Sequence, residues 1–263
     1  MELVFLDYRL KGENINLVIH HNTITGLIND SENTFFNLIS LKKIGRGQII
    51  IDNEKVTKDD IIINQKRISQ VRDNIKFPSY LNTIEELMNN SFRINNINVK
   101  NPIKKIKDSL KIVGIDESYI DHNLNSLSNS EKKLVTIAIG LLSNPDTLVI
   151  EEPFKYLDIK QEKRLFLILQ KLVEQYDKTI IIKTDDSEVI YKYTKEVIAI
   201  KNNDILVHGA TDEVYQRVDF LKRNGISIPD IVNFTYIAKK DKNAKIDYHK
   251  DIRDIIKDIY KHV

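Results

Sequence analysis

Runs of apolar residues divide the 263-residue chain into strands and helices that follow one another. Four short β-branched runs come after Pro145, and each is apolar nearly throughout: TLVIE, TIIIK, EVIAI and DILVHG. Such runs are typical of strands that helices cover on both faces. Because strands alternate with helical patterns, we predict an α/β fold with a mixed or parallel sheet.

Shorter patterns predict the connections. NLVIHHNTITGLI is a predicted hairpin whose second arm ends at Ile28, and FFNLISLKK is the helix expected after it. In GQIIIDNEKVT, Asn53 marks a tight polar turn after a strand. KNN, residues 201–203, predicts the turn of a hairpin between the last two strands.

The middle and the end of the chain have helical patterns. Residues 74–143 contain TIEELMNNSF and NPIKKIKDSLKIVGI without a convincing strand, which predicts an inserted helical subdomain. We expect a core domain over residues 1–215 and a helical extension over residues 216–263. Near its end, one apolar stripe is formed by Ile252, Ile255, Ile256 and Ile259. This stripe either packs on the chain's own core or binds a partner.

Composition excludes several classes of protein. With 41% apolar and 30% charged residues, the chain can bury one sizeable core. Its formal charge of +2 is too balanced for a nucleic-acid binder. The absence of Cys excludes disulfides and thiolate metal sites and fits an intracellular protein. No apolar run is long enough to cross a bilayer.

The stretch GLINDSENTFFNLIS, residues 26–40, has the layout of a phosphate-binding loop. A strand leads into a polar turn and the turn into a helix, as in G-x-x-x-x-G-K-[ST]. Glu32 stands where Lys is expected. A plain connection in which Asp30 or Ser31 caps the helix accounts for the same residues without any nucleotide.

Residues 124–158 carry the most specific pattern in the chain. LSNSE at 127–131 is followed by NP at 144–145, LVIEEP at 148–153 and LD at 157–158. In order and spacing, this segment is similar to the signature-to-D-loop segment of ABC-type ATPases, which reads L-S-G-G-[EQ], N-P, D-E-P and L-D.

The resemblance to ABC-type ATPases extends over nearly the whole chain. INLVIHHNTITGLI fits the segment before their P-loop, and TIIIKTDD lies at the place of their switch histidine. DEVYQRVDFLKRNGISIPDIVNFTYIAKK resembles the C-terminal extension of the ATPase subunits of energy-coupling-factor (ECF) vitamin and metal transporters. The resemblance implies a P-loop NTPase fold with a helical subdomain and a C-terminal region for dimerisation.

In the P-loop, the chain departs from the family at nearly every position. Counted from Gly26, Ser31 replaces the second Gly, Glu32 replaces Lys, and Asn33 replaces the hydroxyl that holds Mg²⁺, while Thr34 comes one position late. The degenerate loop comprises Asn29, Asp30, Ser31, Glu32, Asn33 and Thr34.

The charge at position 32 decides the prediction for this loop. Two unit charges about 4 Å apart interact by about 4 kcal/mol at an effective dielectric near 20, so repulsion in place of attraction changes the interaction by roughly 8 kcal/mol before screening. Millimolar affinity corresponds to only about 4 kcal/mol. We therefore predict no ATP, Mg²⁺ or other metal in the chain's own site.

Other family positions are altered in the same direction. The resemblance places Asp73 at the Q-loop glutamine and Asp185 at the switch histidine, and an ionised Asp cannot donate a hydrogen bond to a phosphate. Glu151 matches the acid that helps to hold Mg²⁺, and Glu152 matches the acid that polarises water. We expect these two acids to face opposite ways as successive strand residues, and to be a catalytic remnant. Tyr8 matches the aromatic residue that stacks on adenine, or is an ordinary core or surface Tyr.

The signature motif has a different role, because ABC ATPases pair head to tail and each signature helix faces the partner's ATP. Here Ser128, Asn129, Ser130 and Glu131 would be turned toward that nucleotide, with Asp158 in the D-loop. Ser128 and Glu131 also form a capping box, which needs no nucleotide. The apolar face of this helix is predicted to comprise Leu134, Ile137, Ala138, Leu141 and Leu142.

The prediction is a degenerate, non-hydrolysing ABC subunit of an ECF-type transporter. The resemblance implies that it pairs with an intact ATPase subunit, which supplies ATP and Mg²⁺, and that residues 70–90 contact a transmembrane coupling subunit. It would lie at the cytoplasmic face of the membrane and would not bind nucleic acid. Two alternatives stay open: an active ABC ATPase with unusual ligands, and a soluble structural or regulatory protein with an ABC fold.

Overall fold

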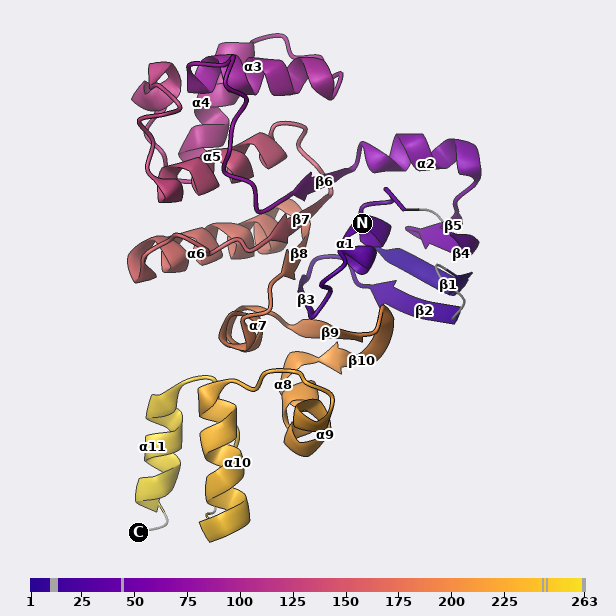
Figure 1. Ribbon diagram of the computed structural model, residues 1–263, viewed down its shortest axis with the longest axis vertical. Helices are drawn as coiled ribbons and strands as arrows, with labels where there is room; N and C mark the ends of the chain where they lie inside the picture. Colours follow the sequence, from indigo (N-terminus) through magenta and orange to yellow (C-terminus); the bar gives the residue numbers. More distant parts are fainter. Residues whose placement is uncertain (10–13, 44, 243, 245, 262–263) are drawn as a thin grey trace. The chain divides into compact units, whose positions relative to one another are not determined.

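The computed structural model describes residues 1–9, 14–43, 45–242, 244 and 246–261 (Figure 1). The chain forms two compact units. The first comprises residues 1–22 and 37–181, and the second comprises residues 23–36 and 182–263.

A four-stranded antiparallel sheet belongs to the first unit, with the order β2-β1-β4-β5. Its strands are β1 (Leu3–Arg9), β2 (Asn14–Ile19), β4 (Arg46–Ile51) and β5 (Glu54–Lys55). In β2, buried and exposed residues largely alternate, as expected for a strand with one buried face. The turn predicted at Asn53 is confirmed, because Asp52 and Asn53 have positive φ angles of 50° and 68° and connect β4 to β5.

The first unit also contains parallel strands and the helices beside them. β6 (Ile68–Val71) pairs with β7 (Thr147–Glu151), which neighbours β8 (Thr179–Lys183), a strand continued in the second unit. Four of the five residues of β7 and of β8 are buried. The helices flanking these strands in sequence are α2 (Lys58–Gln65), α5 (Asn129–Leu141) and α6 (Ile159–Tyr176).

The segment predicted to be helical contains helices throughout. α3 (Ile84–Ile94), α4 (Pro102–Ile112) and the short 3₁₀ helix η1 (Glu117–Asp121) precede α5. Side chains of Thr83, Asn101 and Asp116 accept hydrogen bonds from the first backbone N–H groups of α3, α4 and η1. An isolated bridge between Thr83 and Asn123 is the β pairing found in the described part of this segment.

In the second unit, β8 neighbours β3 (Ile24–Ile28), which pairs in parallel with β9 (Glu196–Lys201). β10 (Asp204–Ala210) pairs antiparallel with β9 through a turn in which Asn202 and Asn203 have φ angles of 54° and 64°, so the predicted hairpin is confirmed. The helices of this unit are α1 (Thr34–Ile39, which begins here), α7 (Ser187–Tyr193), α8 (Thr211–Tyr215), α9 (Val218–Arg223), α10 (Asp230–Lys242) and α11 (Ile252–Lys261).

Two strand predictions were wrong. β2 and β3 do not form a hairpin with each other: β2 pairs with β1, whereas β3 pairs with β9. All five residues of β3 are buried, which suits a central strand, whereas β2 has buried residues on one face and mostly exposed residues on the other. β10 is a partly exposed edge strand instead of a fully covered one, since only Val207 in it is buried.

The helices after β10 share a core with the strands of the second unit. Val197 and Ala199 of β9 and Val214 of α8 pack in one buried cluster with Leu221 of α9 and Val232 of α10. Residues beyond 216 therefore continue this unit. Among the described residues, no helix has the length and apolar character needed to span a membrane.

Candidate functional site

In the loop between β3 and α1, the side chain of Asp30 caps the start of α1. Asp30 is 1% exposed. One of its oxygens accepts hydrogen bonds from the backbone N–H groups of Thr34 and Phe35 at 2.9 and 3.2 Å, and the other accepts from Phe36 at 2.8 Å. These are the first three N–H groups of α1, which a phosphate would need in a P-loop. The predicted cap is therefore confirmed for Asp30.

Side chains of the same unit hold this loop in place. Asp185 accepts a hydrogen bond from the backbone N–H of Asn29 at 2.9 Å, and the Asn29 side chain donates to the carbonyl oxygen of Ile200 at 2.9 Å. The Thr34 hydroxyl donates to the side-chain oxygen of Asn203 at 2.9 Å. Asp185, which was expected at the switch position, thus supports the loop backbone.

The electrostatics of the loop follow from burial of Asp30. Burial raises the pKa of this carboxyl above its ordinary value, while the hydrogen bonds from Phe36 and Phe35 and the charge of Lys183 act in the opposite direction. The Lys183 ammonium lies 5.7 Å from the centre of the Phe36 ring. Glu32 is exposed, as is Ser31. The loop therefore presents carboxylates where a nucleotide would bring further negative charge.

At the end of β7, in the first unit, the acids belong to an ionic cluster. Asp73 bonds the Lys133 ammonium at 2.7 Å with one oxygen and the Lys155 ammonium at 2.6 Å with the other. The backbone N–H of Asp73 donates to the Glu151 carboxylate at 3.1 Å, and Lys133 also donates to the Glu151 carbonyl oxygen at 3.3 Å. The carboxylate and the carbonyl oxygen of Glu151 therefore both accept hydrogen bonds from other residues of the chain.

Lys133 is fully buried, with 0% of its side chain exposed. Partial burial raises the pKa of Asp73, but the hydrogen bonds and charges of Lys133 and Lys155 lower it more, so the pKa lies below its ordinary value. Sequence reasoning missed Lys133. Its position four residues before Ile137 on the apolar face of α5 was a signal that the side chain points inward.

The signature segment caps α5. The Ser128 hydroxyl accepts from the backbone N–H of Glu131 at 3.3 Å, and the Glu131 carboxylate accepts from the backbone N–H of Ser128 at 2.8 Å. The predicted capping box is confirmed. Ser128 and Asn129 are exposed, whereas Leu134 and Ile137 are buried as predicted for the inner face of the helix. The start of α5 thus presents polar groups to the outside.

Comparison with known proteins now gives the family. A family model described as ABC transporter matches residues 13–155, more than half of the chain. The chain belongs to the ABC transporter family. It is also similar over 249 residues, at 27% identity, to the energy-coupling factor transporter ATP-binding protein EcfA2 of Clostridium perfringens, covering 91% of this chain and 85% of that protein. The EcfA2 protein of Enterococcus faecalis is 27% identical over 84% of this chain and 79% of its own length.

Solved structures of ABC proteins have the same fold. The structure of cbiO1 from Clostridium perfringens, part of the ABC transporter complex cbiONQ, matches with a TM-score of 0.71 and 22% identity over 89% of this chain and 98% of that one. A dimeric bacterial ABC transporter cassette matches with a TM-score of 0.66 and 22% identity over 80% of this chain and 99% of that one. The predicted ABC-type α/β fold is confirmed.

Tyr8 lies in the core, which is one of the two positions expected for it, whereas Glu152 differs from its expectation. Tyr8 is 1% exposed, its ring packs edge-on against Phe5 at 5.4 Å, and its hydroxyl accepts from the backbone N–H of Gly45. Tyr8 is therefore a core residue of β1 and not a surface for adenine. Glu152 is not a strand residue after Glu151, because β7 ends at Glu151 and Glu152 has a φ of 48°. The two acids are set apart by this turn and not by strand alternation.

The D-loop acid has a structural contact in this ABC chain. The Asp158 carboxylate accepts from the backbone N–H of Gln161 at 2.8 Å, and the Gln161 side-chain oxygen accepts from the backbone N–H of Asp158 at 3.1 Å. Asp158 therefore caps α6 through a second capping box of the kind seen at Ser128.

Proposed function

We propose that this chain is a degenerate, non-hydrolysing ABC subunit of an ECF-type transporter, and that it pairs with an intact ATPase subunit. The single observation that carries the proposal is the Asp30 carboxylate, which takes the three backbone N–H groups at the start of α1. A triphosphate would have to displace a buried side chain of its own charge before it reached those groups.

The magnitudes favour the closed loop. Hydrogen bonds to a charged group contribute about 1.5–3 kcal/mol each, so displacement of Asp30 costs several kcal/mol. That cost alone is comparable with the roughly 4 kcal/mol of a millimolar complex. Glu32 adds repulsion where an ammonium group would attract the nucleotide.

The test is a titration of the purified chain with a fluorescent ATP analogue and Mg²⁺. We expect no saturable binding below millimolar nucleotide. The double variant Asp30→Gly/Glu32→Lys removes the carboxylate that occupies the N–H groups of α1 and reverses the charge at position 32. It should bind the ATP analogue at least tenfold more tightly than the wild type. Micromolar binding by the wild type would favour an active ATPase with unusual ligands and would contradict the proposal.

The role proposed for α5 is to face the ATP held by the partner's P-loop. Ser128 and Asn129 are exposed at the start of the helix, and α5 has 13 residues whose inner face is buried. The Ser128 hydroxyl caps the backbone N–H of Glu131 and not those of Asn129 and Ser130, so this cap leaves the first two N–H groups of a firmly packed helix for a phosphate. Because Asn129 and Ser130 stand in place of Gly, their side chains restrict the approach of a phosphate. The same side chains offer polar groups for hydrogen bonds.

A transmembrane coupling subunit is the second proposed partner, at the inner face of the membrane. Support comes from a cavity of about 580 Å³ in the first unit. It is lined by the C-terminal end of α2, by β6 and the turn after it, by the C-terminal part of α3 and the turn after it, and by α5. Gln70, Arg72 and Asn74 of this lining lie in the region expected to contact a membrane subunit. Recovery of the chain alone from its own cells by affinity purification would contradict both partnerships and favour a soluble regulatory role.

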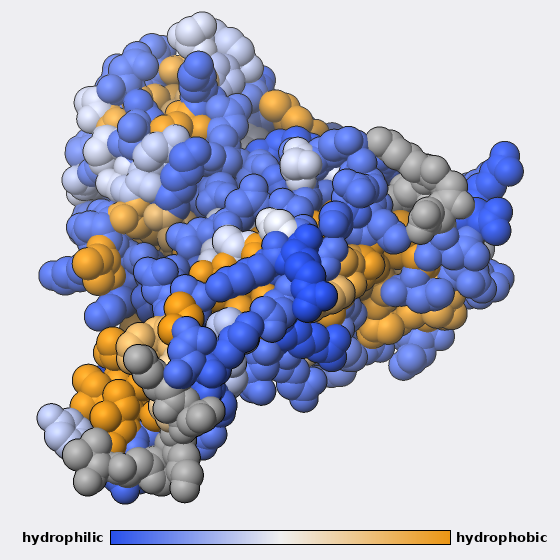
Figure 2. Space-filling view, turned by 60° about the horizontal axis from the view of Figure 1, so that its bottom comes forward, coloured by the Kyte–Doolittle hydropathy of each residue, from blue (hydrophilic) through white to orange (hydrophobic). Residues whose placement is uncertain are grey.

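The C-terminal helices are proposed to contribute to pairing with the other ATPase. Hydrophobic side chains gather at this end of the chain (Figure 2). Of the apolar stripe predicted in α11, only Ile255 is buried, at 1% exposure, whereas Ile252, Ile256 and Ile259 are 63%, 44% and 38% exposed. Tyr260 adds an aromatic residue that is 79% exposed. Apolar surface of this kind is typical of protein interfaces.

A further inference from the structure

A cavity of about 380 Å³ in the first unit is lined by apolar side chains and by lysines. It lies among the C-terminal part of α4, the end of α5 and the second half of α6. The apolar lining consists of Ile112, Leu141, Pro145, Ile168, Leu172 and Tyr176. The basic lining consists of Lys105, Lys111, Lys171 and Lys178. No carboxylate is among the lining residues in the described part of the chain.

Three of these lysines, Lys105, Lys171 and Lys178, form no ion pair within the described residues, whereas Lys111 also lies near Asp116. Lys178 donates to the carbonyl oxygen of Asn144 at 3.4 Å, which places its ammonium at the cavity. The ammonium groups around this apolar cavity repel one another. An anion that enters the cavity would attract them and offset this repulsion.

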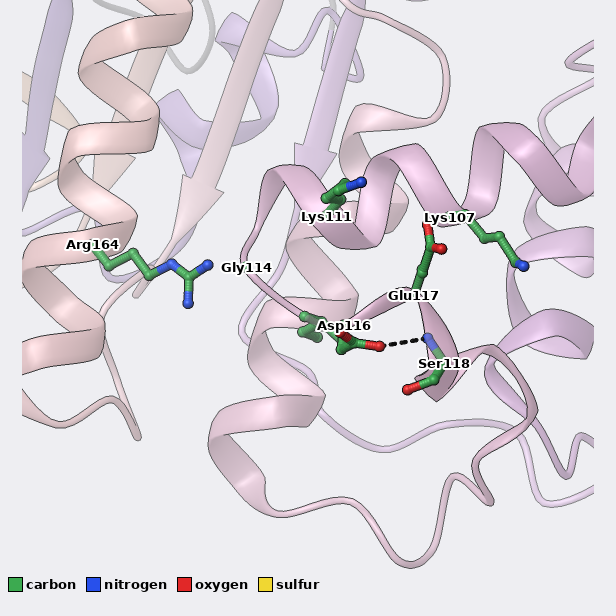
Figure 3. Close-up of a pocket in the computed structure, with 8 residues that line it drawn as sticks. Lys107, Lys111, Gly114, Asp116, Glu117, Ser118 and Arg164 are labelled. Atoms are coloured by element: carbon green, nitrogen blue, oxygen red, sulfur yellow. Dashed lines mark hydrogen bonds between the residues drawn. The ribbon is translucent and has the colours of Figure 1, made fainter.

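A neighbouring pocket shows that this arrangement is not general for the chain. That pocket also includes Lys111, with Lys107 and Arg164, but Asp116 and Glu117 offset their charge (Figure 3). Asp116 accepts from the backbone N–H of Ser118 at 2.9 Å. Its lining is mixed in charge, so it selects neither anions nor cations. The cavity with four lysines has charge of one sign only.

We infer that the four-lysine cavity binds an anionic amphiphile, a molecule with a phosphate or carboxylate group on an apolar body. The lysines would bind the acid group, and the apolar side chains of the lining would contact the apolar body. The volume falls at the small end of ligand cavities, which are typically about 300–1,000 Å³. The cavity lies at the C-terminal end of α5 and along the second half of α6, whereas the signature segment and Asp158 lie at the N-terminal ends of these helices. The inference therefore does not rest on the proposed transporter role.

Such a ligand has two sources, a free small molecule or the headgroup region of an anionic phospholipid, and the experiment separates them. The first arm is calorimetric titration of the chain with octyl phosphate below its micelle concentration, with inorganic phosphate and octyl glucoside as controls. The second arm is flotation with phosphatidylglycerol-containing vesicles and with phosphatidylcholine vesicles. Binding of octyl phosphate at one site, with neither control binding, supports a free amphiphile. Binding to the anionic vesicles alone supports the lipid source.

The variants decide whether the bound anion occupies this cavity. Lys105→Gln and Lys171→Gln should each weaken binding about tenfold, since each removes one charge-assisted contact. Lys163→Gln, also exposed on α6 but outside the lining, is the matched control and should not change binding. Absence of binding in both arms, or equal binding by the Lys105→Gln/Lys171→Gln double variant and the wild type, would overturn the inference.

Discussion

At the scale of single residues, Asp30 occupies the backbone N–H groups that a nucleotide-binding loop offers to phosphate. Asp30→Ala leaves three backbone N–H groups without their acceptor in a buried place. We expect a loss of about 2–4 kcal/mol in the free energy of unfolding, measured by urea denaturation. Asp186→Ala is the matched control, because Asp186 caps α7 from an exposed position and should cost about 1 kcal/mol. Equal losses would show that the burial of Asp30 does not matter.

Two carboxylates should change stability with pH in opposite directions. The pKa of Asp30 is raised in the folded chain, so between its ordinary value and the raised value the folded state retains a proton that the unfolded state has lost, and stability falls as pH rises. The pKa of Asp73 is lowered, so its contribution is present above the ordinary value and is lost as pH falls toward the folded pKa. Urea denaturation of Asp30→Asn and Asp73→Asn against wild type from pH 3 to 7 should give difference curves of opposite slope.

At the scale of elements, α2 and α5 begin with the same capping box, which allows a controlled test of the signature helix. Ser128→Ala on α5 and Thr57→Ala on α2 should each lower the free energy of unfolding by about 1 kcal/mol. If α5 serves the partner's ATP, only Ser128→Ala should also slow ATP hydrolysis by the assembled complex, by about tenfold. Equal hydrolysis rates for both variants would restrict Ser128 to its structural role.

The exposed stripe of α11 can be tested in the same way. Ile256→Glu/Tyr260→Ser replaces exposed apolar side chains with polar ones, so the folded chain should keep its stability within about 0.5 kcal/mol. Its association with the partner ATPase should weaken by tenfold or more in analytical ultracentrifugation. Lys257→Gln, exposed on the same helix, controls for changes that do not touch the stripe. Unchanged association of the double variant would mean that pairing does not use α11.

At the scale of the whole molecule, the sequence predicted the order of elements better than their partners. The runs at 147–151 and 179–183 and the Asn-rich turns followed from local residues, since burial and turn chemistry are encoded locally. The pairing of β2 with the preceding strand β1, and of β3 with β9, which is distant in sequence, did not, because strand choice depends on contacts that no local pattern records. The Asp73–Lys133 pair was missed for the same reason.

The last prediction concerns the assembled pair of ATPase chains. If this chain's P-loop position is closed by Asp30, the pair has one working ATP site, formed by the partner's loop and this chain's α5. Glu152→Gln in this chain should then leave the hydrolysis rate of the complex within about twofold, while Gln in place of the matching acid of the partner should lower it by about 10³-fold or more. Nucleotide trapped by the complex should amount to one ATP per pair. A strong loss of hydrolysis with Glu152→Gln, or two trapped nucleotides, would mean that the loop of this chain opens in the complex and binds ATP despite its carboxylates.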